Sequence, residues 1–419
     1  MSQRRIHAPR ISRYLPTQGT EFVSVEVLSG IALLLAAAAA LIWANVDAAS
    51  YEDLWETHLT IGIGDFSISE SLVKWVNDAL MVLFFFVVGL EIKRELVEGE
   101  LRDPRAAALP VLGALGGMVV PALIFVAFNA GGSGALGWGI PMATDIAFAL
   151  GILALLGPRI PSGLKLFLLT LAIVDDVGAI LVIAVFYTSD LEPLWLLGAA
   201  GAILGILVMR RLGFMNPWMY MLPGVVLWVC THESGIHATI AGVVLGLLTP
   251  VTRGPEAGPL ETLERRLHPW TSFLIVPIFA LANAGVVLGG NSLERAASSA
   301  VTWGVIAGLV VGKAIGVSVF ALGARRLGIG RLPAGVRSAH VIGAGILAGI
   351  GFTVSIFVAN LSFSGGLLDR AKIGVLGASL LAGILGATWL TVLGRQSVAA
   401  PPPASPGAVA SAAETDGSR

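Results

Sequence analysis

Long apolar segments, separated by short polar ones, recur along nearly the whole chain. A helix needs roughly 17–25 apolar residues to cross the hydrocarbon core of a bilayer. We therefore predict about twelve membrane-spanning helices, at residues 23–45, 71–92, 106–128, 135–156, 163–187, 193–209, 215–231, 235–250, 270–290, 301–324, 338–361 and 371–394. The first run could instead belong to a signal peptide, since arginines precede it, but its length and the hydrophobic chain behind it favour a retained helix.

Polar sequence is confined to a few places. This pattern divides the chain into a cytoplasmic N-terminal tail (1–20), a transmembrane domain (21–395) and a C-terminal tail (396–419). The C-terminal tail is rich in Pro, Ala and Ser, and we expect it to be disordered and cytoplasmic. Within the domain, residues 46–70 form a polar region that we place on the outer side.

A different periodicity appears in residues 58–68 of that outer region. Apolar and polar residues alternate there, and Gly64-Asp65 provides a turn signal, so the segment predicts a short β-hairpin. An irregular loop is the equally weighted alternative. Because a lone hairpin is marginally stable in water, we expect this one to pair with another edge, such as the same hairpin of a second subunit.

Composition supports a polytopic membrane protein. Of 419 residues, 56% are hydrophobic and only 13% are charged, with a mean hydropathy of +0.85, whereas soluble domains carry about 25% charged residues. A net charge of −1 gives no basic surface for nucleic acid. The single cysteine, Cys230, excludes an internal disulfide framework, and no GxxxxGK[ST] phosphate loop for ATP is present.

The lysines and arginines fix an orientation. With both termini in the cytoplasm, two of the 26 basic residues (Lys74 and Lys313) fall within predicted spans, 21 lie on the inner side, and three remain outside. Cytoplasmic loops of membrane proteins are enriched in Lys and Arg. So unequal a distribution supports both the number of spans and the topology. One missed helix would place the basic loops that follow it on the wrong side of the membrane.

Four ionisable residues lie deep within the predicted spans: Asp145, Asp175, Asp176 and Lys313. A charge at the bilayer centre costs roughly 2.5–3.5 kcal/mol on insertion scales, so four unpaired charges would oppose insertion by roughly 10–14 kcal/mol. A chain that retains such residues must pair, hydrate or use them. Lys313 lies too centrally for its side chain to reach the interface easily, and its natural partner is one of the three aspartates.

The adjacent pair Asp175-Asp176 is the strongest candidate for ion binding. Neighbouring residues on a helix point about 100° apart, so both carboxylates can reach one cavity while meeting different partners. Like charges in a low dielectric resist joint ionisation, which suits a site that exchanges H⁺ for a metal cation. The alternative, two acids that only join helices through hydrogen bonds, is less favoured for so apolar a helix.

Two predicted spans carry signals of interruption. Pro141 precedes Thr144 and Asp145 in the fourth span, and proline removes a backbone donor. In the eleventh, residues 345–353 contain three glycines and Thr353. If the third to fifth spans and the last three form an inverted repeat, the two breaks occupy matching positions, a pattern typical of transporter binding sites. Asp145 could also cap a helix, and the glycines could simply permit close packing.

A second polar cluster is predicted at the cytoplasmic ends of two helices. Glu91 and Glu95 stand four residues apart, as do Glu264 and His268, so each pair shares a helix face. Such a group can titrate near neutral pH, through histidine in particular; a solvated charged rim is the alternative. His237, at the start of the eighth span, is either a hydrogen-bonded core histidine or a part of pH sensing.

Several strings in this order resemble the NhaA-type bacterial sodium/proton antiporters, from about residue 20 to 395. They are FVVGLEIKRE (86–95), ATDIAFALG (143–151), AIVDDVGA (172–179), SGIHAT (234–239), FALANAG (279–285), GKAIG (312–316) and GIGFTVSIF (349–357). The resemblance implies an all-α fold of twelve helices with inverted repeats, two crossed broken helices and a small outer β-hairpin. It also implies electrogenic exchange of Na⁺ or Li⁺ for H⁺, activation at alkaline pH, a homodimer formed through the hairpin, and the bacterial inner membrane.

By motif position, the resemblance also implies roles for individual residues. Asp175 and Asp176 are similar to the family's ion- and proton-carrying pair, with Lys313 as the lysine that pairs with the first. Thr144 and Asp145 match residues of an extended segment that compensate helix dipoles. The positions linked to pH response are Glu91, Glu95, Glu264 and His268. We expect no cofactor beyond the transported ions.

Two other classes of protein compete with this interpretation. An intramembrane aspartyl protease needs two aspartates on separate helices, which Asp145 and Asp175 could supply, but it leaves Lys313 and Asp176 without a role. An ion-coupled symporter for an organic anion would need cationic groups at its site, whereas this chain offers three acids and one lysine.

Overall fold

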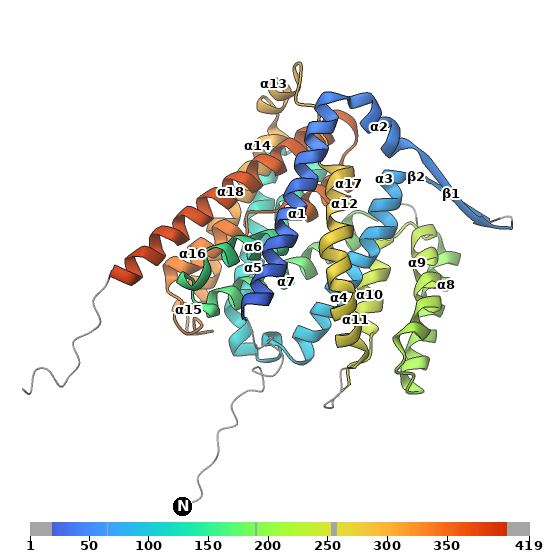
Figure 1. Cartoon of the computed structure of the whole chain (residues 1–419), viewed down its shortest axis with the longest axis horizontal. Coiled ribbons are helices and arrows are strands. Elements are labelled where there is room, and N and C mark those ends of the chain that lie inside the picture. Colours follow the sequence, from blue (N-terminus) through green and yellow to red (C-terminus); the bar gives the residue numbers. More distant parts are fainter. Residues whose placement is uncertain (1–18, 65, 189–190, 253–257, 400–419) are drawn as a thin grey trace, which may run out of the picture.

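The computed structural model describes residues 19–64, 66–188, 191–252 and 258–399, and this part of the chain is helical apart from one hairpin (Figure 1). Most of the two predicted tails, residues 1–18 and 400–419, lies outside the described residues. The last helix, α18, reaches Ala399, a few residues beyond the predicted end of its span.

The outer region contains a short helix and the predicted hairpin. After α1 (Gly19–Val46), α2 (Ala48–Glu56) leads into β1 (His58–Ile63) and β2 (Phe66–Ser71), which pair antiparallel with Ile61 opposite Ile68. The second strand extends beyond the predicted boundary at 68. Gly64 has a φ of +64°, which glycine adopts without strain. The two strands project from the helical body (Figure 1).

Each predicted span corresponds to helical structure. The elements between residues 72 and 211 are α3 (Leu72–Trp75), η2 (Val76–Leu80), α4 (Met81–Val97), η3 (Glu100–Arg102), α5 (Pro104–Asn129), η4 (Ala135–Met142), α6 (Ile146–Leu155), η5 (Gly157–Arg159), α7 (Ser162–Phe186) and α8 (Pro193–Arg211). Those after residue 216 are η6 (Pro217–Tyr220), α9 (Met221–Glu233), α10 (Thr239–Leu248), α11 (Pro259–Trp270), η7 (Thr271–Ile275), α12 (Val276–Asn283), α13 (Ser292–Ala297), α14 (Ala300–Ile306), η8 (Ala307–Gly312), α15 (Lys313–Arg326), α16 (Ser338–Leu347), α17 (Phe352–Ser362) and α18 (Gly365–Ala399).

The predicted number of twelve spans is not confirmed. Among the described residues, eight helices are long and apolar enough to cross a membrane, or nine if α16 and α17 form one bent span. The other three predicted spans correspond to shorter helices, α9 and α10, and to a stretch that begins in polar sequence. That stretch starts at Pro259 and ends at Asn283, not at 270 and 290, because proline suits the first helical turn and the amphipathic segment after it continues the helix.

Two helices are interrupted in the middle. Extended backbone at Ala143–Asp145 separates η4 from α6, and a second break separates α16 from α17, whose axes differ by 46°. The breaks touch, because the backbone N–H of Asp145 donates to the carbonyl of Ile350 over 2.6 Å. Irregular backbone at membrane depth is tolerated only inside protein or beside a cavity. Here a backbone N–H of the first break bonds a backbone carbonyl of the second.

Close packing of α5 against the α14–α15 stretch encloses this crossing on one side. Gly116 of α5 faces Gly316 of α15, and a Cβ added to either would collide with the other's backbone carbonyl. The backbone of Pro121 in α5 lies against Gly312 in a similar way, whereas Gly308 packs mainly against the side chain of Pro141. Small residues allow helix backbones to approach closely in lipid, and this contact brings the start of α15 toward the breaks.

We predict that Gly316→Ala destabilises the protein by at least about 1–3 kcal/mol, the usual cost of overpacking, because the colliding atom belongs to the backbone and cannot rotate away. The free energy of unfolding in detergent measures this effect. Gly323→Ala is the matched control on the same helix, since no atom lies within 4 Å of its added Cβ. Equal behaviour of the two variants would contradict the prediction.

Candidate functional site

An uninterrupted helix presents the aspartate pair. Asp175 and Asp176 lie in the middle of α7, which runs from Ser162 to Phe186. The Asp175 side chain is completely buried and Asp176 is 4% exposed. Both therefore lie inside the protein, as the sequence predicts, rather than facing lipid.

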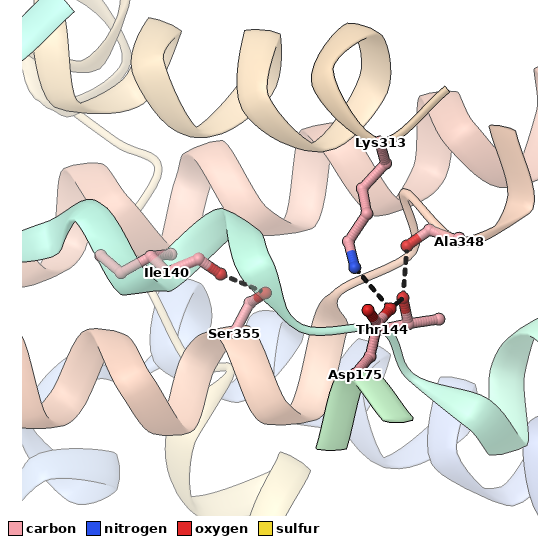
Figure 2. Close-up of polar contacts among 6 residues, drawn as sticks. All are labelled: Ile140, Thr144, Asp175, Lys313, Ala348 and Ser355. Atoms are coloured by element: carbon pink, nitrogen blue, oxygen red, sulfur yellow. Dashed lines mark hydrogen bonds and ion pairs between the residues drawn. The ribbon is translucent and has the colours of Figure 1, made fainter. Parts of the chain in front are cut away.

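Lys313 forms an ion pair with Asp175. Its Nζ lies 2.6 Å from Asp175 Oδ2, and both side chains are fully buried. Lys313 follows directly after the π-helical turn η8, a local irregularity often found at functional sites. Figure 2 shows the lysine side chain reaching from α15 to the carboxylate of α7. The aspartate partner that the sequence left open is thus Asp175.

The first break contributes a hydroxyl to the same carboxylate. Thr144 Oγ1 lies 2.7 Å from Asp175 Oδ2 and 2.9 Å from the carbonyl oxygen of Ala348, which belongs to the second break (Figure 2). A hydroxyl carries one proton, so it can donate to only one of these acceptors at a time. Thr144 therefore connects both breaks to the ion pair.

Asp145 fastens the two broken helices together. Its Oδ1 accepts from the backbone N–H of Phe148 and caps α6, while its Oδ2 accepts from both the hydroxyl (2.7 Å) and the backbone N–H (3.2 Å) of Thr353. A carboxylate suits the positive ends of two helices. Sequence reasoning identified the cap but not Thr353 as the partner of Asp145.

A second hydroxyl on α17 was missed from the sequence. Ser355 Oγ donates over 2.7 Å to the carbonyl of Ile140, a group in η4 just before the first break (Figure 2). Its position two residues after Thr353 was the available signal. The backbone groups that these contacts reach are the carbonyls of Ile140 and Ala348 and the N–H of Thr353.

Three asparagines that we did not predict form a hydrogen-bonded network nearer the outer end of the molecule, in which Asn283 is fully buried and the other two are half-buried. Asn283 of α12 exchanges hydrogen bonds with Asn77 of η2 and accepts one from Asn360 of α17 over 2.8 Å. The network joins α17 to two helices that do not contain a break. Amides inside predicted spans are costly to bury without a partner, and that was the signal available.

Two carboxylate oxygens of the pair remain free. Asp175 Oδ1 and Asp176 Oδ1 are buried and have no hydrogen-bond partner among the described residues. A buried polar atom without a partner costs free energy, and an anionic oxygen attracts a cation or a proton. These two oxygens are therefore the atoms of the site that are free to bind a cation or a proton. Within the described residues, no group of three or more His, Cys, Asp or Glu is placed to hold a metal ion.

The predicted cytoplasmic cluster is partly assembled. Arg94 of α4 pairs with Glu264 of α11, and Glu95 accepts a hydrogen bond from the backbone N–H of Glu100. Burial raises the pKa of the Glu264 carboxyl, although Arg94 opposes the shift. Burial, together with the charge of Arg94, lowers the pKa of His268. The cluster therefore lies between two helices and is not a freely solvated rim.

The remaining candidates for pH sensing lie elsewhere. Glu91, also on α4, is near enough to Asp176 for the two charges to interact. His237 lies between α9 and α10, where its ring packs edge-on against Phe357 of α17 with centroids 6.1 Å apart. This contact places His237 beside a broken helix and not among the residues around Glu264.

Crossed, interrupted helices around a buried charged site define the class of this protein as a secondary transporter of the membrane. Residues 20–390 match the family model described as Na⁺/H⁺ antiporter 1. The chain belongs to this family.

Two relatives that are also named Na⁺/H⁺ antiporters align with 90% of this chain. The protein is 48% identical to the Na⁺/H⁺ antiporter NhaA of Escherichia coli O1:K1 / APEC, over 90% of this chain and 98% of the relative. It is 46% identical to the Na⁺/H⁺ antiporter NhaA 3 of Frankia alni, over 90% and 89% of the two chains. The solved structure of the sodium proton antiporter MjNhaP1 from Methanocaldococcus jannaschii covers 91% of this chain at 13% identity with a TM-score of 0.54, a similarity of fold.

We predict that Lys313→Met, which keeps most of the side-chain volume, destabilises the protein by about 3–5 kcal/mol because it leaves a buried, uncompensated carboxylate. The free energy of unfolding in detergent is the measurement. Lys74→Met is the matched control: Lys74 pairs with Glu70 at 3.0 Å, but its side chain is 59% exposed, and such pairs contribute about 0–1 kcal/mol. A loss no larger than that of the control would contradict the prediction.

Proposed function

We propose that this protein exchanges cytoplasmic Na⁺ or Li⁺ for external H⁺ across the bacterial inner membrane. The observation that carries the proposal is the buried pair of adjacent carboxylates, of which Asp175 is held by Lys313 and Asp176 has a free oxygen. Membership of the Na⁺/H⁺ antiporter 1 family and the names of the relatives support the same exchange.

Competition for one set of oxygens couples the two ions. Na⁺ is a hard cation that prefers oxygen ligands. Asp175 and the Thr144 hydroxyl supply them at the first break, and Asp176 adds a second carboxylate from the same helix. A proton on a carboxylate removes the negative charge that holds the metal ion. Binding of either ion therefore expels the other, and a site that opens alternately to each side exchanges them.

Lys313 gives the exchange a net movement of charge. When Na⁺ approaches Asp175, the ion competes with the ammonium for the same carboxylate, and the lysine can then release its proton from the buried site. More protons than sodium ions thus move in each cycle. One net charge crossing 100 mV releases roughly 2.3 kcal/mol, which drives Na⁺ outward against its gradient.

The competing classes fit the geometry less well. A protease would need Asp145 and Asp175 to share a substrate, but Asp145 is engaged by Thr353 and Asp175 by Lys313. A symporter for an organic anion would need cationic groups free for the substrate, whereas the ammonium of Lys313 is already paired. The relatives are named antiporters.

Regulation by pH and pairing of subunits complete the proposal. The Arg94–Glu264 pair joins α4 to α11 at the cytoplasmic end, and its acid ionises at a higher pH than an exposed glutamate because burial raises its pKa. Rising pH therefore completes this pair and favours one arrangement of the two helices.

At the outer end, the hairpin has backbone edges through which two copies of the chain can join.

We predict that Asp176→Asn abolishes exchange while the protein still folds, because an amide carries no charge for Na⁺ and cannot take up the transported proton. Everted vesicles loaded with acridine orange report exchange as dequenching when NaCl or LiCl is added, and size-exclusion chromatography reports folding. Glu294→Gln, on the exposed helix α13, should leave exchange unchanged. Retained Na⁺/H⁺ exchange in Asp176→Asn would refute the assignment.

We also predict that Glu264→Gln moves the pH of half-maximal exchange toward more alkaline values, by on the order of one unit, the shift that about 1.4 kcal/mol produces. The neutral amide resembles protonated glutamate, so the variant cannot complete the pair with Arg94 as the pH rises. The same vesicle assay, scanned over pH, measures it. Glu261→Gln removes an equal charge from α11 as control; equal shifts in both variants would assign the effect to net charge alone.

A further inference from the structure

A cavity of about 280 Å³ opens beside α13 and the start of α14. Its walls are the end of α5 and the loop after it, the junction between α13 and α14, and the first two turns of α18. These elements lie at the same end of the molecule as α2 and the hairpin (Figure 1), the end that the distribution of lysine and arginine assigns to the outside. The cavity is separate from the aspartate site.

The polar side of the cavity carries an uncompensated positive charge. Arg370 lines it together with the hydroxyl-bearing residues Ser133, Ser298 and Ser299, and no acidic residue takes part. In the described part of the chain, no carboxylate lies within ion-pair distance of the Arg370 guanidinium; Thr302 bonds only its backbone carbonyl. The Arg370 guanidinium, which carries five N–H donors, therefore lines a space that no carboxylate borders.

The other side of the cavity is apolar. Phe128, Val301 and Leu367 line it, and Phe128 is 49% exposed. A small soluble anion would leave these side chains uncovered. A ligand with a charged head and an apolar body would cover both sides at once.

The distribution of charge points in the same direction. The three basic residues that the topology places outside are Arg295, Arg370 and Lys372, and all three come from α13 and the start of α18, which contact each other. Of these three, only Arg370 lines the cavity, and the acidic neighbours Glu294 and Asp369 are not part of its lining. Because no acid lines the cavity, the amine of a zwitterionic headgroup would meet no carboxylate there.

We propose that this cavity binds the headgroup of an anionic glycerophospholipid from the outer leaflet. Arg370 pairs with the phosphate, in the two-pronged geometry that guanidinium and phosphate share. The serine hydroxyls bond the hydroxyl groups of the headgroup, and Phe128 and Leu367 lie against the beginning of the acyl chains.

Titration of the purified full-length protein in neutral detergent tests the proposal. Phosphatidylglycerol should raise the thermal midpoint in a saturable manner, whereas phosphatidylcholine and inorganic phosphate should not do so at the same concentrations. Arg370→Gln should need about tenfold more phosphatidylglycerol, since a hydrogen bond to a charged group contributes that much binding. Ser133→Asp, which leaves Arg370 intact but adds a negative charge to the lining, should weaken binding as well.

Arg295→Gln is the matched control, because it removes the same charge from the same side at an exposed position outside the cavity lining. Unchanged lipid binding in Arg370→Gln and Ser133→Asp would overturn the proposal. Equal weakening in Arg370→Gln and Arg295→Gln would also overturn it, because the effect would then be one of overall charge. Protection by inorganic phosphate equal to that by phosphatidylglycerol would replace the lipid with a free anion.

Discussion

The cost of holding charge away from water shapes the interior of this protein. Lys313 and Asp175 are both completely buried, and each is tolerable only because the other lies 2.6 Å away. Removing two such ions from water costs several kcal/mol for each, which their attraction repays only with good geometry and further hydrogen bonds. That requirement fixes α15 against α7, and the glycine contact between α5 and α15 supplies the closeness that the pair needs.

The same constraint explains why the two breaks cross. An interrupted helix exposes backbone groups that lipid cannot satisfy, and each break alone would be costly. Here Asp145 caps α6 and receives two bonds from Thr353, while Thr144 reaches the carbonyl of Ala348. The polar groups freed by one interruption are thus used by the other, so the two broken helices are stable only as a pair.

The sequence indicated the charged residues more readily than their partners. Asp145, Asp175, Asp176 and Lys313 stand out because charges are rare in apolar runs, and the period-two alternation at 58–68 predicted the hairpin. Ser355 and Asn283 gave weaker signals, and the partners that they bond could not be foreseen. Hydroxyls and amides inside helices often bond their own backbone, and only the packing of distant segments shows that Ser355 reaches Ile140. Helix boundaries such as Pro259 were missed because a polar turn can continue an apolar helix without a change of structure.

A comparison of the three aspartates separates scaffold from function. Asp145 accepts three hydrogen bonds, from Phe148 and Thr353, and is saturated as a capping group. Asp175 keeps one free oxygen beside its ion pair, and Asp176 has a free oxygen and no lysine of its own. Evolution of a merely stable core would satisfy these atoms, since each costs free energy when left unpaired. A site that must bind and release small cations instead requires carboxylates that still have oxygens free to accept, and α7 provides them beside the crossing of the two broken helices.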